Sequence, residues 1–158
     1  MADPAEDAGR RLGIARSLIE EMRIMKRFAG AWKLLSFEET QPDGSVTHPY
    51  GQDPIGLLMY DAGGRMAVQI MRRDRPALSS GDVQEANPDE IKSAVEGFTA
   101  FFGTYEIDEA RKIVVHHVEG HLLPNSVGKD LKRSFEFSGD RLILRPTDTR
   151  RLIWERVK

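Results

Sequence analysis

Three of the four histidines in this 158-residue sequence fall within one short stretch, VVHHVEGH, residues 114–121. In a regular strand successive side chains point to opposite faces, so His117, Glu119 and His121 share one face and His116 lies on the other. Imidazole titrates near neutral pH, and a neighbouring carboxylate can orient it or exchange a proton with it. We expect this face to carry the polar part of an interior site. His117 would act as base, Glu119 as acid or orienting group, and His121 as a ligand contact.

The same three side chains permit two other interpretations. His117-x-Glu119-x-His121 offers nitrogen and oxygen donors that zinc, iron or copper use. Same-face residues of a strand are about 6.6 Å apart, so a metal would need a ligand from elsewhere, and we predict no metal site. The face can also be an exposed polar surface, because valine occurs on both faces and periodicity alone leaves the inward face open. Gly120 allows a bulge that would re-aim His121.

Further polar candidates lie where segments join. His48 and Tyr50 belong to the stiff segment 47–54, which contains two prolines and could hold them at a barrel rim. Asn125 follows the histidine strand and could lie over the same end of a cavity. Arg72, at the end of an expected strand, could bind a carboxylate or phosphate of an entering ligand. Each also has a purely structural interpretation, as a rigid corner, a turn asparagine or a solvated ion pair.

The residues after Gly30 form short segments rich in β-branched and aromatic residues, separated by turn sequences such as Pro42-Asp43-Gly44. This pattern predicts a mainly β, up-and-down antiparallel barrel. The expected strands are 31–40, 45–48, 55–60, 65–72, 103–107, 112–122, 131–137, 141–145 and 151–157.

Two helices are predicted beside the strands. Residues 5–27 place apolar side chains toward one side, so we expect an amphipathic helix, residues 1–28, packed on the barrel domain, residues 29–158. An interface role for this helix, including a homodimer, stays open. The sequence Asn87-Pro88-Asp89-Glu90 predicts the start of an inserted helix, which apolar spacing through Phe102 extends to about Gly103.

Several blocks resemble a known family. Gly30-Ala31-Trp32 looks like the G-x-W start of lipocalins, and the chain end through Arg156 resembles the strand whose arginine packs on that tryptophan. The blocks GAWKLLSFEE, PYGQDPIGLLMY, MRRDRP and HHVEGHLLPNSVG resemble, in order, the bacterial and fungal lipocalin-like domain family. This resemblance implies a closed barrel with a central cavity but no single activity. Stacking of Arg156 on Trp32 would close the narrow end.

Composition limits the function classes. The sequence has 23 Lys and Arg against 25 Asp and Glu, so no strong field favours nucleic acid or an anionic membrane. Cysteine is absent and the N-terminal sequence does not look like a secretory signal, so we expect a cytoplasmic protein. We predict binding of a small, largely apolar, hydrophobic or aromatic molecule inside the barrel. The alternative is a cofactor-independent lyase, isomerase or cyclase that uses the same cavity.

Overall fold

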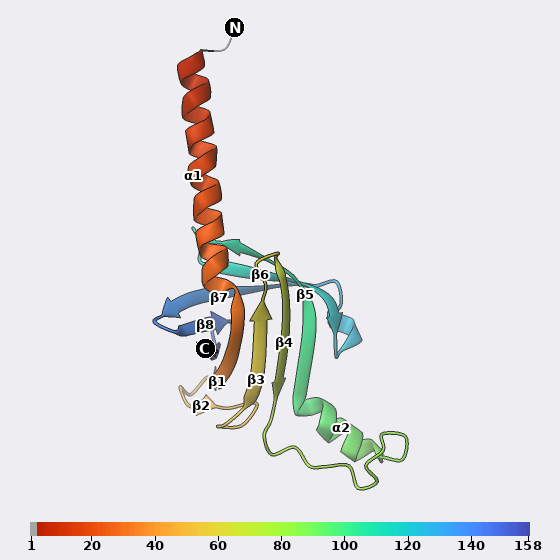
Figure 1. Ribbon diagram of the computed structural model, residues 1–158. Coiled ribbons are helices and arrows are strands. Elements are labelled where there is room, and N and C mark those ends of the chain that lie inside the picture. The colour runs from red at the N-terminus through yellow and green to blue at the C-terminus, as the bar shows by residue number, and fades with distance from the viewer. Residues whose placement is uncertain (1–2) are drawn as a thin grey trace.

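Eight antiparallel strands form a closed barrel in the computed structural model, which describes residues 3–158 (Figure 1). Each strand pairs with its neighbour in sequence, and the first pairs with the last, which closes the sheet. The predicted up-and-down topology is confirmed. The barrel strands are β1 (Gly30–Thr40), β3 (Ile55–Tyr60), β4 (Arg65–Met71), β5 (Phe98–Asp108), β6 (Ile113–His121), β7 (Asp130–Ser138), β8 (Arg141–Arg145) and β9 (Arg150–Arg156). A two-residue strand, β2 (Val46–Thr47), pairs with the end of β1.

Aromatic side chains close the end of the barrel where β1 begins. Trp32 is fully buried, and its indole Nε1 donates to the carbonyl of Phe28 at 2.8 Å. The guanidinium of Arg156 lies 4.2 Å from the Trp32 ring centre and donates to the carbonyls of Ala29 and Arg27 at 2.8 and 2.5 Å. The predicted stacking of Arg156 on Trp32 is confirmed. This end of the barrel is therefore filled by side chains.

The N-terminal helix α1 (Pro4–Phe28) meets the barrel only at its last turns. Asp3 caps its first turn, accepting from the Ala5 backbone at 3.0 Å. Only Ile24 and Phe28 are buried, and the preceding turns project away from the closed end (Figure 1). The predicted packing on the barrel is thus limited to these last turns, where Met25 is also half-buried against the core, while Leu12, Leu18 and Met22 remain exposed. The homodimer stays a prediction.

The inserted helix α2 (Pro88–Glu96) begins as predicted and ends earlier. Asn87 and Glu90 form a capping box, with each side chain accepting from the other's backbone at 3.0 Å. The helix ends at Gly97, and residues from Phe98 onward pair with β4 as strand β5. The predicted extension to Gly103 is wrong because cross-strand pairing on both sides outweighs the helical spacing of the phenylalanines. Neither helix of the described chain is long and apolar enough to cross a bilayer.

Candidate functional site

The face of strand β6 that carries His116, and not the face that carries His117 and Glu119, points toward the barrel interior. Val114, His116 and Val118 are buried, and His116 is 2% exposed. His117 and Glu119 alternate with these residues and lie on the outer wall. The inward orientation expected for His117 and Glu119 is therefore wrong. Alternation correctly separates the two faces, but the pairing of β6 with β5 and β7 decides which of them looks inward.

The outward side chains form ion pairs with neighbouring strands. His117 Nδ1 lies 2.6 Å from Asp130 Oδ1, and its Nε2 lies 3.5 Å from Glu106 Oε2. Asp130 is the main cause of a raised His117 pKa. Glu119 Oε2 accepts from Arg65 Nη2 at 2.6 Å. The His117 contacts join β6 to its neighbours β5 and β7, and the Glu119–Arg65 pair reaches across β5 to β4, all outside the cavity.

A bulge at the end of β6 returns His121 to the interior. Gly103 pairs with Val118 and Phe102 with Gly120, so Glu119 is the extra residue between the two pairs. A Cβ on Gly103 would lie 1.9 Å from the His117 carbonyl oxygen, and one on Gly120 would lie 2.4 Å from the Phe102 ring. The close approach of two backbones therefore requires glycine at position 103, whereas at position 120 a side chain would displace the Phe102 ring.

His121 consequently lines the open end of the barrel. Its ring stacks on Phe101, with ring centres 5.3 Å apart and planes 6° from parallel. Its Nδ1 accepts from the Leu123 backbone at 2.9 Å. Burial lowers the His121 pKa, so the neutral ring is favoured.

The barrel interior contains two adjoining spaces. The mouth cavity has a volume of about 370 Å³, at the lower end of the range of ligand pockets, roughly 300–1,000 Å³. A deeper space of about 30 Å³ lies toward the closed end. Both spaces share the lining residues Ile70, Phe101, Arg133 and Leu152. The rest of the mouth lining is Phe37, Pro49, Tyr50, Glu96, Thr99, His121, Ser126, Leu131, Pro146 and Arg150.

His116 lines the deep space and is hydrogen-bonded to the buried Tyr60. Tyr60 Oη and His116 Nε2 are 2.6 Å apart, and both residues are 2% exposed. Burial holds the His116 pKa well below its usual value and raises that of Tyr60, so both side chains are neutral near pH 7. The other imidazole nitrogen, Nδ1, has no hydrogen-bond partner within residues 3–158.

Arg133 places a guanidinium between the two spaces. It lies 5.6 Å from the centre of the Phe101 ring, and its Nη1 donates to the Leu131 carbonyl at 3.2 Å. Within the described chain it forms no ion pair. Burial lowers its pKa, although an arginine remains charged. The interior therefore holds a positive charge with which no carboxylate of residues 3–158 forms an ion pair.

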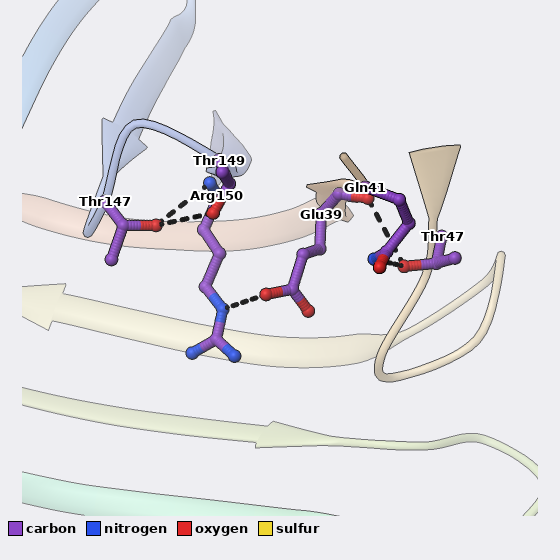
Figure 2. A network of polar contacts seen from close by, with 6 residues as sticks. All are labelled: Glu39, Gln41, Thr47, Thr147, Thr149 and Arg150. Carbon is purple, nitrogen blue, oxygen red and sulfur yellow. Dashed lines mark hydrogen bonds and ion pairs between the residues drawn. The ribbon is translucent and has the colours of Figure 1, made fainter. Parts of the chain in front are cut away.

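A polar network stabilises the mouth where β1, β2 and β9 meet (Figure 2). Arg150 Nε donates to Glu39 Oε1 at 2.9 Å, and the Arg150 backbone donates to Thr147 Oγ1 at 3.1 Å. Gln41 Nε2 donates to Thr47 Oγ1 at 2.8 Å, which joins β2 to this edge. Arg150 thus lines the mouth as half of an ion pair, unlike Arg133.

The remaining predicted site residues divide between the mouth and the surface. Tyr50 lines the mouth and stacks on Phe37 with ring centres 5.2 Å apart, so its rim position agrees with the prediction. His48 and Asn125 lie outside the cavity lining, next to lining residues. Arg72 forms a two-armed hydrogen bond with Asp74 at 3.0 Å beside a separate surface hollow.

The metal interpretation of the histidine strand has no geometric support. His117 and Glu119 lie on the outer wall, while His121 lines the interior, so the three cannot converge on one ion. Throughout residues 3–158 no group of three His, Cys, Asp or Glu side chains is arranged to bind a metal.

A signal in the sequence could have identified Arg133. In β7, Leu131, Phe135 and Phe137 alternate with polar residues, and Arg133 occupies the same face as the apolar ones. A single charged residue in an otherwise apolar inward row is unusual and indicates a paired or functional group.

Comparison with known proteins agrees with this architecture. The family model described as a lipocalin-like domain matches residues 29–157, which include all eight barrel strands. A sequence search finds no match among curated proteins. The match covers most of the chain and leaves out α1 up to Phe28. The chain belongs to the lipocalin-like domain family, as the sequence blocks predicted.

Proposed function

We propose that the barrel binds a small, largely apolar organic molecule in the mouth cavity. The observation that supports this proposal most directly is the cavity itself, which has a volume of about 370 Å³ and is lined in about equal number by apolar and by polar residues. The family match supports it, because a lipocalin-like barrel suggests small-molecule binding. Phe37, Ile70, Phe101, Leu131 and Leu152 would contact the apolar part of the ligand.

Polar groups at two depths would orient the ligand. Tyr50 and His121 supply a phenol and an imidazole near the opening. Arg133 and His116 supply a guanidinium and an imidazole at greater depth, in the lining of the deeper space. Polar groups set among apolar side chains give a bound molecule its orientation and give the site its specificity.

The Tyr60–His116 pair supports a second candidate function, cofactor-independent acid–base catalysis in the same cavity. A neutral imidazole that is hydrogen-bonded to a phenol can accept a proton from a bound molecule. However, burial lowers the His116 pKa far below neutrality, which makes the imidazole a weak base. We therefore place binding before catalysis as the proposed function.

Titration with the neutral fluorophore 1-aminoanthracene tests the cavity. We expect saturable binding with enhanced fluorescence, and a Ser126→Trp variant, which fills part of the mouth, should weaken it about tenfold. Ser134→Trp is the matched control, because Ser134 is exposed on the outer face of β7. Equal affinity in the wild-type protein and Ser126→Trp would show that the fluorophore binds elsewhere.

A further inference from the structure

Arg133 is an arginine that lines both interior spaces and, among the described residues, has no carboxylate partner. Ion pairs at 2.6–3.4 Å balance Arg65, Arg145, Arg150 and Arg151. Arg133 points inward, and its one side-chain hydrogen bond within the described residues goes to a backbone carbonyl. Glu96 also lines the mouth, and its carboxylate pairs with Lys92 on α2 at 3.7 Å. The interior charge is therefore left for something other than the chain to balance.

The groups around Arg133 do not supply a negative charge. Its titratable neighbours are Tyr60, His116 and His121, all of which are neutral or cationic in the accessible pH range. An isolated cation in an apolar interior is costly unless it is paired. Because the folded protein keeps the Arg133 charge in its interior, we expect an anion from solution to balance it.

The buried polar atoms that lack a hydrogen-bond partner in the wall of the deep space are hydrogen-bond donors. Trp154 Nε1 is a donor, is buried, and has no partner in residues 3–158. His116 Nδ1 is likewise buried and unpartnered, and it carries the proton when Nε2 accepts from Tyr60. Together with the guanidinium they make a wall rich in donors and poor in acceptors.

We propose that the natural ligand is a small carboxylic acid whose carboxylate pairs with Arg133 while its apolar body occupies the mouth cavity. This inference rests on the proposed binding function and names the class of ligand. The planar guanidinium matches the two oxygens of a carboxylate. One negative charge balances one guanidinium, whereas a phosphate monoester carries almost two. The deep space of about 30 Å³ also limits the head group to a small one.

Displacement of 1-aminoanthracene by matched acid and neutral compounds tests the proposal. Two pairs serve, decanoate with 1-decanol and 2-naphthoate with 2-naphthamide, at pH 8, where both acids are ionised. In at least one pair the wild-type protein should bind the anion about tenfold more tightly, the strength of one charge-assisted hydrogen-bonded contact. Arg133→Met should lose this preference and still bind 1-aminoanthracene.

Arg150→Met is the matched control, because Arg150 lines the same mouth but is already paired with Glu39. It should keep the preference for the anion. If the fluorophore binds and neither pair shows a preference, the carboxylate proposal is overturned and the cavity proposal stands. If the fluorophore does not bind to the wild-type protein, the binding function itself fails. Loss of the preference in Arg150→Met but not in Arg133→Met would overturn the assignment to Arg133. If Arg133→Met does not fold, Arg133→Gln serves as the variant for the same test.

Discussion

The buried Tyr60–His116 hydrogen bond provides a quantitative test of the interior that is independent of any ligand. Tyr60→Phe removes one hydroxyl and keeps the ring, whose centre lies 5.2 Å from that of Phe28 and 4.6 Å from that of Tyr105. His116 then has no hydrogen-bond partner at either nitrogen. Leaving a buried polar group unpaired costs about 1–3 kcal/mol of unfolding free energy. For a domain of this size that loss corresponds to a melting temperature lower by about 2–12 °C.

The corresponding double variant sharpens the test. His116→Leu alone leaves the Tyr60 hydroxyl unpaired and should cost a similar amount. Tyr60→Phe combined with His116→Leu removes both partners, so it should be more stable than the sum of the single losses predicts. Tyr105→Phe is the control, because its hydroxyl donates to the Asp61 carbonyl at 2.7 Å in a less buried position. Its loss should be smaller, about 0.5–1.5 kcal/mol.

Urea unfolding of the ligand-free protein measures these differences. Trp32 and Trp154 are 0% and 1% exposed, so their fluorescence reports loss of the barrel interior. Single variants as stable as the wild-type protein, or a double variant whose loss equals the sum of the two, would refute the paired arrangement.

Two further predictions concern the helix and the outer wall. Phe28→Ala should lower the unfolding free energy by about 3–5 kcal/mol because its ring is fully buried at the closed end, whereas Leu18→Ala on the projecting part of α1 should change it by less than about 0.5 kcal/mol. Similar losses in urea unfolding would contradict the described placement of α1. His117 gains a raised pKa from Asp130, so its contribution is fully present below its unfolded pKa of about 6.5 and is lost as pH rises through the higher folded pKa. His117→Gln should remove that decline in a series of unfolding curves against pH, and a decline of unchanged size in the variant would assign it to other groups. His116 has the opposite effect on stability. Because its pKa is lowered in the folded protein, the unfolded chain binds its proton more readily, so this residue lowers the unfolding free energy as pH falls.

Much of the barrel could be predicted because its signals are local. Alternating apolar residues and turn sequences identify most of the strands, and the residues Gly30, Trp32 and Arg156 identify the closed end. The boundary at Phe98 could not be predicted in this way. Its phenylalanines fit a helical spacing, and only pairing with β4 and β6, formed from distant parts of the chain, makes the segment a strand.

The candidate site shows the same division more sharply. The sequence by itself determined that His117 and Glu119 lie opposite His116, because side chains alternate along any strand. It did not determine which face is inward, since valine occurs on both. Only closure of the barrel decided this, because burying the apolar rows of β5 and β7 forces His116 inward and leaves the carboxylate of Glu119 in solvent. The same closure, with the bulge at Glu119, brings His121 and Arg133 from separate strands to one cavity.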